Sequence, residues 1–328
     1  MNAMKMDNIN KVLFITLSNI GDAILTLPAL TCLKDNFKDA KVDVVAGPRS
    51  KEVFIKDPSI NKIFIYDKHA SLKEKIGFVK NLRKERYDLA VDMKTSLMPL
   101  LAGARYRNSL ISFKPSGLKH KRLIHLNKLR GLGLACGTRR NIYIDQGDRS
   151  KIDNILKQKG AKDTDTLIGI SPSCLSLTKE WRMDGFIEVV KGLVKKADTR
   201  IILIGEETKK DVSGHILKSV SSANIIDLTG KTDLGELFAA IERMKILVSC
   251  DSASMHIASD LGIRVVSIFG PTDPLEYGPA GKYSVVIQKK LDCVPCKRPA
   301  CRFNNECMDE IKPEEVIEAV NKLLESNM

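Results

Sequence analysis

One stretch of the chain, residues 246–274, restricts the possible folds more than any other. It joins two apolar runs of strand length to a segment with helical spacing between them: Ile246–Val248, Ala253–Leu261 and Val265–Phe269. A helix between two short apolar runs, with almost no spacer, is typical of a parallel sheet. Asp251 and Ser252 occupy the expected start of the helix and are good N-cap residues. The stretch therefore predicts a helix N-terminus at the carboxyl end of a strand, where backbone N–H groups can bind a diphosphate.

The same alternation of strand and helix signals continues through both halves of the chain. In the first half we expect strands at residues 12–17, 42–45, 63–66 and 89–93, with helices at 23–37, 50–56, 72–84 and 96–101. In the second half we expect strands at 167–171, 200–204 and 225–228, with helices at 183–196, 209–219 and 234–244. A chain of 328 residues is long enough for two cores, and the polar segment 145–165 separates the halves. We predict an α/β protein with two Rossmann-like, doubly wound domains facing a cleft, at residues 1–150 and 151–328.

Positive charge is concentrated in the first half. Residues 1–150 carry 28 Lys and Arg against 14 Asp and Glu, whereas residues 151–328 carry 25 against 26. A charge that served only solubility would be spread over both halves, so we expect the first domain to meet an anionic partner. The run from Arg105 to Arg130 is the most basic part and is expected to be the loop-rich acceptor side, with Lys119, Lys121 and Arg122 as candidate binding residues.

The N-terminal residues 1–11 contain no apolar core, and the longest apolar runs have the length of strands. We therefore expect neither a signal peptide nor a membrane-spanning helix, and a cytoplasmic location. In that reducing compartment the eight cysteines are expected to be thiols or metal ligands. Cys32, Cys136, Cys174 and Cys250 are expected to be scattered and mostly buried thiols.

Three motifs together carry a resemblance to a known family. They are Leu17–Asp22, the D-[ST]-[GA]-x-x-H pattern at Asp251–His256 followed by Phe269–Pro274, and the closing segment Cys293–Met308. From Lys11 to about Leu324 the chain resembles the family 9 glycosyltransferases, the ADP-heptose:lipopolysaccharide heptosyltransferases, and most of all the type that adds the second heptose.

The resemblance implies the GT-B architecture, with the sugar donor on the second domain and the acceptor on the first. It further implies an inverting transfer of heptose from ADP-L-glycero-D-manno-heptose to the inner core of lipopolysaccharide on lipid A. No cofactor is expected, and the enzyme is expected to touch the anionic inner face of the cytoplasmic membrane peripherally.

The resemblance also implies roles for residues of the second domain. Its K-x-W pattern places Lys179 on the donor phosphates, with a surface lysine as the alternative, whereas Trp181 is expected to pack. The other candidate donor-binding residues are Asp251, Ser252, Ala253, His256, Glu206, Glu207 and Thr232. His256 can equally be a structural hydrogen-bonding residue, and Thr232 departs from the apolar residue that some family members place against the adenine.

Asp22 is the candidate catalytic residue. An inverting transfer needs a carboxylate that takes the proton of the acceptor hydroxyl, and the resemblance places that base at Asp22. The alternative is that Asp22 only caps the helix expected at Ala23–Phe37, and one residue can do both. Ser18, Asn19 and Gly21 in the same loop are candidate acceptor-binding residues.

Four cysteines with the spacing C-x2-C-x4-C-x5-C resemble a zinc knuckle: Cys293, Cys296, Cys301 and Cys307. The alternative is a metal-free structural feature of the family. For the transfer itself we expect no metal, because Lys179 and a helix N-terminus can neutralise the diphosphate. The sequence Asp163-Thr164-Asp165 imitates a metal-binding D-x-D signature but lies in the polar linker.

Two rival functions come from other protein classes. The basic first half would suit a nucleic-acid-binding protein, but only 5% of residues are aromatic, and the charges lack the repeated interleaved aromatics of an RNA-binding surface. A nucleotide-sugar epimerase would need a bound nicotinamide, and the loop after the first strand has only Gly21 where the fingerprint needs three glycines. We therefore expect no nucleic-acid partner.

Overall fold

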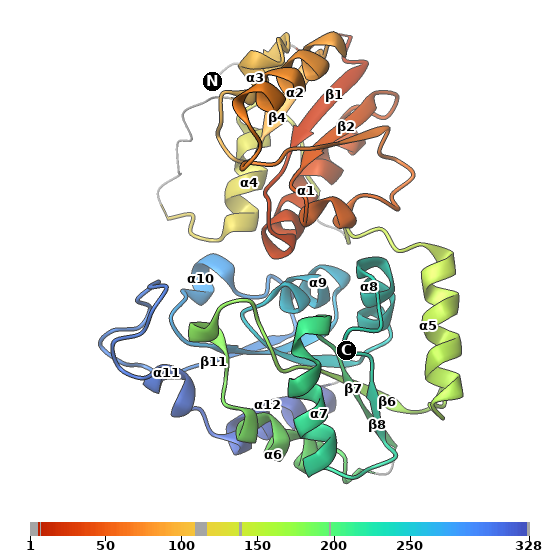
Figure 1. Ribbon diagram of the computed structural model, residues 1–328, viewed down its shortest axis with the longest axis vertical. Coiled ribbons are helices and arrows are strands. Elements are labelled where there is room, and N and C mark those ends of the chain that lie inside the picture. The colour runs from red at the N-terminus through yellow and green to blue at the C-terminus, as the bar shows by residue number, and fades with distance from the viewer. Residues whose placement is uncertain (1–5, 7, 109–116, 138–139, 197, 327–328) are drawn as a thin grey trace. The chain divides into compact units, whose positions relative to one another are not determined.

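The computed structural model describes residue 6 and residues 8–108, 117–137, 140–196 and 198–326. The chain divides into two compact units, Met1–Tyr143 and Ile144–Met328. Each unit contains one parallel sheet with helices packed on it (Figure 1), which confirms the predicted α/β class with two Rossmann-like domains. The predicted boundary at residue 150 falls inside helix α5 (Gln146–Gln158). The polar segment thus belongs to the second unit, because α5 packs beside α8 there and Arg149 pairs with Glu242 at 2.6 Å.

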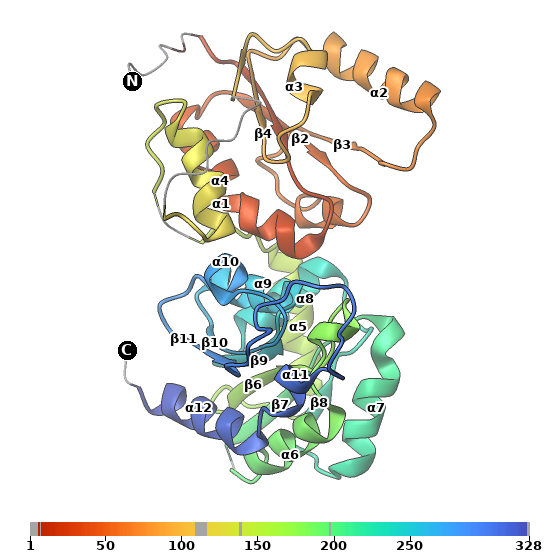
Figure 2. The ribbon, with the colours of Figure 1, turned by 90° about the vertical axis from the view of Figure 1, so that its left-hand side faces the viewer.

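The first unit has a five-stranded sheet in the order β3-β2-β1-β4-β5. Its strands are β1 (Lys11–Ile15), β2 (Lys41–Ala46), β3 (Lys62–Ile65), β4 (Leu89–Asp92) and β5 (Tyr106–Arg107). Its helices are α1 (Ile20–Asn36), α2 (Leu72–Lys84), α3 (Met98–Leu101) and α4 (Lys121–Arg130), with a 3₁₀ turn η1 at Ser50–Val53. The central strand β1 is apolar throughout Val12–Ile15 and fully buried, as expected for a strand covered on both faces. Helix α4 lies against α1 (Figure 2).

The second unit has a six-stranded sheet in the order β11-β10-β9-β6-β7-β8. Its strands are β6 (Thr166–Ser171), β7 (Thr199–Leu203), β8 (Ile225–Asp227), β9 (Ile246–Cys250), β10 (Arg264–Phe269) and β11 (Ser284–Gln288). Its helices after α5 are α6 (Met183–Leu193), α7 (Lys210–Ser219), α8 (Leu234–Glu242), α9 (Ala253–Leu261), α10 (Pro274–Tyr277), α11 (Glu306–Asp309) and α12 (Pro313–Glu325), with 3₁₀ turns η2 (Leu177–Lys179) and η3 (Glu207–Lys209). Among the helices described, none is both long and apolar enough to cross a membrane.

Local sequence fixes several helix boundaries. Helix α2 begins at a capping box formed by Ser71 and Glu74, and α8 begins at one formed by Asp233 and Glu236. Helix α9 is followed by Gly262 as its C-cap. The φ of Gly262 is 75°, a left-handed conformation that residues with a side chain rarely adopt. These ends were readable from the residues because each depends only on its neighbours in the chain.

The basic run 105–130 is less irregular than predicted. It was expected to be rich in loops, but its last ten residues form helix α4, which buries His125, Leu126 and Leu129. Tertiary packing against α1 stabilises this helix in spite of its many charges. Residues 109–116 of the basic run lie outside the described part of the chain.

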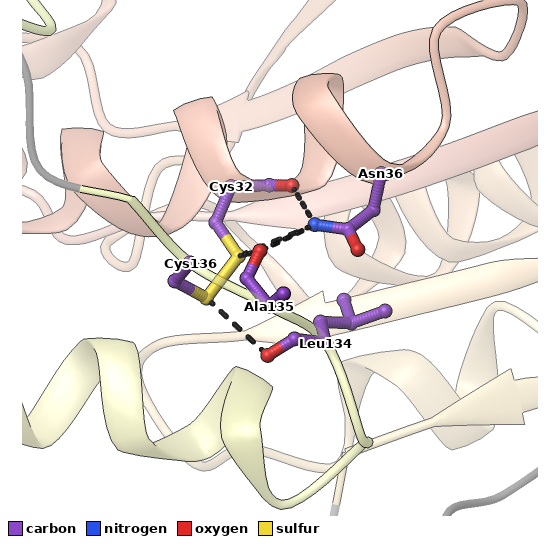
Figure 3. The surroundings of a disulfide bond; sticks show 5 residues. All are labelled: Cys32, Asn36, Leu134, Ala135 and Cys136. Carbon is purple, nitrogen blue, oxygen red and sulfur yellow. Dashed lines mark hydrogen bonds between the residues drawn. A yellow bond between two sulfur atoms is a disulfide. The ribbon is translucent and has the colours of Figure 1, made fainter.

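Two of the four cysteines expected to be thiols are joined instead. Cys32 of α1 and Cys136, which follows α4, form a disulfide across 104 residues of sequence (Figure 3). Asn36, one turn further along α1, donates its Nδ2 proton to the Ala135 carbonyl at 2.8 Å. The sequence did not show this pairing because only the packing of α4 on α1 brings the two cysteines together.

Trp181 is a core residue, as predicted. Its indole is buried, donates Nε1–H to the Ile311 carbonyl at 3.2 Å and meets the ring of Phe186 edge-on at 4.9 Å between centroids. Gly185 of α6 lies under the same indole, where an added Cβ would come within 2.6 Å of the ring. The glycine is therefore required by close packing.

This packing predicts opposite outcomes for two glycine-to-alanine substitutions. Gly185→Ala should lower the free energy of unfolding by about 1–3 kcal/mol, because the new methyl group overpacks the buried indole. Gly214→Ala in α7 is the matched control, since nothing lies within 4 Å of its added Cβ, and it should raise that free energy by about 0.5–1 kcal/mol. Urea denaturation of both variants checks this. Equal effects would show that the Trp181 contact does not limit the space at residue 185.

Candidate functional site

The second sheet reverses its direction of growth between β6 and β9. Strands β7 and β8 follow β6 on one side, whereas β9, β10 and β11 extend the other side. The loops that follow β6 and β9 must therefore separate at the carboxyl edge of the sheet. In open parallel sheets the crevice formed by this separation is where ligands bind.

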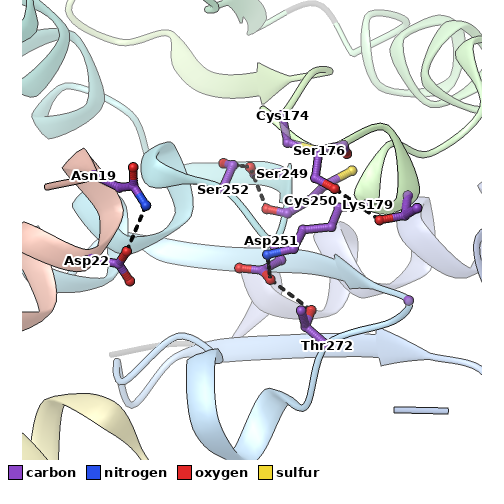
Figure 4. Close-up of polar contacts among 12 residues, drawn as sticks. Asn19, Asp22, Cys174, Ser176, Lys179, Ser249, Cys250, Asp251, Ser252 and Thr272 are labelled. Carbon is purple, nitrogen blue, oxygen red and sulfur yellow. Dashed lines mark hydrogen bonds and ion pairs between the residues drawn. The ribbon is translucent and has the colours of Figure 1, made fainter. Parts of the chain in front are cut away.

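Lys179 and Asp251 meet at this reversal point. Lys179 ends η2 after β6 and Asp251 directly follows β9, yet the Lys179 ammonium lies 2.6 Å from the Asp251 carboxylate (Figure 4). Thr272, in the loop after β10, donates its hydroxyl proton to the same carboxylate oxygen at 2.8 Å. Asp251 is only 7% exposed, so its charge is balanced by Lys179 and its position is fixed by two donors. The resemblance named Lys179 and Asp251 as donor-binding residues but did not include Thr272, and in the structure the side chains of all three are in contact.

Helix α9 begins beside this ion pair. Its N-cap is Ser252, whose side chain makes no capping hydrogen bond but lies 2.8 Å from the Ser249 hydroxyl (Figure 4). The first amides of a helix have no partner within the helix, so the half-buried start of α9 at Ala253 directs N–H groups outward. Together with the ammonium of Lys179 it offers a positive potential suited to a phosphate group.

Glu206, Glu207 and Thr232 lie in two adjacent loops at the carboxyl ends of β7 and β8. Glu206 is the N-cap of η3, and Glu207 is exposed and pairs with Lys210 at 2.8 Å. The loops touch because Gly230, with a φ of 64°, brings its Cα so close to Glu207 that an added Cβ would lie 2.7 Å from the Glu207 Cα. These predicted donor-binding residues therefore share one edge of the sheet with Lys179 and Asp251.

The interior beneath this edge is apolar. His256 is buried in α9, and its backbone N–H reaches the Ser252 carbonyl at 3.4 Å. Cys174 and Cys250 are buried free thiols, as predicted. Burial raises the pKa of Cys174 to about 12, and it also raises the pKa of Cys250 well above its ordinary value, so both stay protonated. They support the site by packing.

In the first unit, Asp22 lies in the first turn of α1. The helix was expected to begin at Ala23 but begins at Ile20, and its N-cap is Asn19. Asp22 is therefore not the cap residue. Its carboxylate accepts a hydrogen bond from Asn19 Nδ2 at 3.0 Å and is half-buried (Figure 4), so it remains accessible to a proton donor.

Three predicted acceptor-binding cations lie around the start of α4. Lys119 is exposed before the helix, while Lys121 and Arg122 are its first two residues. Cations at a helix N-terminus add to the positive end of the helix dipole instead of compensating it. The arrangement thus raises the positive potential at this end of α4.

The four clustered cysteines are free thiols that line one cavity of about 280 Å³. The cavity is also lined by Thr178 and Pro271, the neighbours of Lys179 and Thr272. Cys301 Sγ accepts backbone N–H hydrogen bonds from Phe303 and Asn305, each at 3.3 Å. Within the described part of the chain, no three of the four sulfurs lie within 4.8 Å of one another. The four thiols therefore lie in one cavity beside the site, but their sulfurs are not arranged as the ligands of a tetrahedral metal ion. Both the zinc site and the metal-free cluster stay predictions.

The sequence missed how the loop after β10 is held. Gln288, at the end of β11, donates Nε2–H to the carbonyls of Gly270 and Thr272 at 2.9 and 2.8 Å. It thereby fixes the loop that carries the Thr272 hydroxyl to Asp251. No local motif marks Gln288, because its role depends on β11 pairing with β10.

The D-x-D sequence at residues 163–165 has a structural partner. Its Asp165 pairs with Arg200 at 2.7 Å.

The chain matches one protein family over more than half of its length. A family model described as glycosyltransferase family 9 (heptosyltransferase) matches residues 121–306. Lipopolysaccharide heptosyltransferase 3 of Escherichia coli K12 is 28% identical over 342 residues, which cover 93% of this chain and 95% of that protein.

Solved structures share the fold. A family 9 glycosyltransferase from Veillonella parvula has a TM-score of 0.85 and 23% identity, with 99% of this chain and 100% of that chain covered. The E. coli ADP-heptose lipopolysaccharide heptosyltransferase II has a TM-score of 0.75 and 21% identity, with coverage of 96% and 98%. The fold is therefore that of GT-B heptosyltransferases. Heptosyltransferase 3 and heptosyltransferase II both match this chain, so the comparisons support the family as a whole.

Proposed function

Because this chain belongs to glycosyltransferase family 9, the heptosyltransferases, and is a glycosyltransferase, we propose that it transfers heptose from ADP-L-glycero-D-manno-heptose to the inner core of lipopolysaccharide. The observation that carries the donor assignment is the meeting of Lys179, Asp251 and Thr272 beside the start of α9. An ammonium held at a helix N-terminus, at the reversal point of a parallel sheet, suits a diphosphate.

In the proposed complex, the donor lies along the carboxyl edge of the second sheet. Lys179 and the first amides of α9, from Ser252 and Ala253 onward, bind the diphosphate. Glu206 or Glu207 accepts hydrogen bonds from the ribose hydroxyls, and Thr232 faces the adenine. Both loops that carry these residues end neighbouring strands and are in contact through Gly230, which supports a single extended site.

The proposed chemistry is a single displacement with inversion. An acceptor hydroxyl oxygen forms a bond to the anomeric carbon of heptose while the bond from that carbon to the ADP phosphate oxygen breaks. ADP leaves with the electron pair, and the Asp22 carboxylate takes the hydroxyl proton. Lys179 and the α9 N-terminus stabilise the charge that builds on the departing diphosphate, and we propose that the transfer therefore needs no metal.

On the acceptor side, we propose that the basic start of α4 faces the phosphate-bearing acceptor and the anionic surface in which it is embedded. Lys119, Lys121 and Arg122 carry charges of one sign at the positive end of a helix, which supports attraction to an anionic surface. Ser18, Asn19 and Gly21, next to Asp22, would contact the sugar that receives the heptose.

The donor assignment predicts stabilisation by ligand. ADP or ADP-heptose at about 100 times its Kd should stabilise the native protein by about 2.7 kcal/mol and raise Tm by several degrees, measured by differential scanning fluorimetry. Lys179→Ala and Ala253→Leu should each reduce this shift, whereas Lys191→Ala, an exposed lysine of α6, should leave it unchanged. An equal shift with NAD and none with ADP-sugars would favour a nicotinamide enzyme instead.

The assignment of Asp22 as the base predicts a selective loss of turnover. Asp22→Asn keeps the hydrogen bond from Asn19 but cannot accept a proton, so kcat should fall about 10²- to 10⁴-fold. Tm and ADP binding should be almost unchanged. The control is Asp39→Asn, an exposed carboxylate of the same unit, which should keep full activity. Ordinary turnover by Asp22→Asn would remove Asp22 from the mechanism.

The acceptor-side assignment predicts binding to vesicles that contain anionic, phosphate-bearing lipids, with affinity decreasing as salt increases. Replacing Lys119, Lys121 and Arg122 together by Gln should weaken sedimentation with the vesicles and leave ADP binding intact. The control replaces three exposed lysines of the second unit by Gln: Lys191, Lys195 and Lys218. The assignment would be contradicted by a vesicle affinity that does not change with salt concentration, or by RNA binding much stronger than vesicle binding.

A further inference from the structure

The first sheet has its own reversal point, between β1 and β4. Strands β2 and β3 extend one side of β1, whereas β4 and β5 extend the other. Lys94 follows β4 and Ser18 follows β1, 76 residues apart, and the Lys94 ammonium donates a hydrogen bond to the Ser18 hydroxyl at 3.0 Å. Like Lys179 in the second unit, Lys94 bridges the two loops at the reversal point, but it does so from the opposite loop, the one that follows β4 and not the one that follows β1.

The two lysines differ in what balances their charge. Lys179 pairs with the buried carboxylate of Asp251. The described residues place no carboxylate oxygen within 4.0 Å of the Lys94 ammonium, whose contacts are the Ser18 hydroxyl and the ring of Tyr66 at 6.0 Å. The nearby Asp92 carboxylate is already occupied by backbone N–H groups of Lys94 and Ser96 and by the Ser96 hydroxyl.

A second lysine holds the turn that carries Lys94. The Lys128 ammonium, from α4, donates to the carbonyls of Asp92 and Met93 at 3.3 and 2.8 Å and to the Thr95 hydroxyl at 2.9 Å, so all three of its protons are engaged in this turn. Burial lowers the pKa of Lys94 and of Lys128, and Asp92 only partly offsets this effect. Burial and the charge of Lys128 also lower the pKa of His125 to about 4. His125 is therefore neutral near pH 7, whereas an anion bound at Lys94 would offset the effect of burial on that lysine.

The position of Ser18 relates this charge to the chemistry. Ser18 directly precedes Asn19, the N-cap of α1, and Asn19 holds the Asp22 carboxylate. A group bound at Lys94 would thus contact the same short loop that presents the proposed base. The Lys94 ammonium would bind its negative charge, and the sugar that carries it would be held beside Asp22.

We propose that Lys94, bridged to Ser18 on a turn that Lys128 holds, is an oxyanion-binding site for a phosphate or carboxylate group of the sugar acceptor. This inference rests on the proposed function, because it assigns the acceptor to the first unit. It specifies the substrate class further: the acceptor carries an anionic group near the hydroxyl that receives the heptose.

The test compares steady-state kinetics of three variants with ADP-heptose and a heptose-accepting lipopolysaccharide core. Lys94→Met keeps the aliphatic stem and removes the charge, so KM for the acceptor should rise about 10- to 100-fold while KM for ADP-heptose stays the same. Lys94→Arg keeps the charge and should retain most of the acceptor affinity. Lys73→Met, an exposed lysine of α2, is the control and should behave as the unchanged protein.

Several outcomes decide the matter. The inference is overturned if Lys94→Met has the same acceptor KM as the control Lys73→Met. It is also overturned if Lys94→Arg, which keeps the charge, raises the acceptor KM as much as Lys94→Met does. If the unchanged protein transfers no heptose at all, the proposed function fails first. An acceptor treated with phosphatase identifies the group: a Lys94→Met effect that disappears on it assigns a phosphate, and one that persists assigns a carboxylate.

Discussion

The strand order of each sheet is the constraint on which both candidate sites depend. Parallel strands all end at one edge, and a sheet that grows first to one side and then to the other leaves two loops that diverge beside its first strand. In the second unit these loops carry Lys179 and Asp251, and in the first unit they carry Lys94 and Ser18. Side chains from distant parts of the chain therefore meet without any local motif that joins them.

Electrostatic balance gives the two places different roles. Asp251 is buried and would be costly if left alone, so Lys179 and Thr272 stabilise it and it in turn fixes the ammonium at the start of α9. Such a preorganised cation can meet a diphosphate without moving. Lys94 has a hydroxyl and not a carboxylate as its partner, which leaves positive charge for an anion to neutralise. We assign the donor to the balanced site and an acceptor group to the unbalanced one.

Other residues fix the loops at the carboxyl edges of the two sheets. Trp181 packs on Gly185 just after the loop of Lys179, and Gln288 holds the loop of Thr272. In the first unit, the disulfide between Cys32 and Cys136 and the packing of α4 on α1 hold the helix whose first turn carries Asp22. Residues that do not touch the proposed substrates can therefore change activity through the positions of these loops.

The sequence by itself determined the fold class, most of the strands and helices and the family, because apolar periodicity, capping residues and the motifs at Asp22 and Asp251–His256 are local properties of the chain. The strand pattern also placed Asp251 and the loop of Thr272 at one edge, since residues that follow parallel strands share an edge, and the family resemblance added Lys179. Only the tertiary structure decided the rest: the boundary before α5, the start of α1 at Ile20, helix α4 and the Cys32–Cys136 pair. It alone singled out Lys94, because that requires β4 to pair with β1, and strand order is set by contacts between residues far apart in sequence.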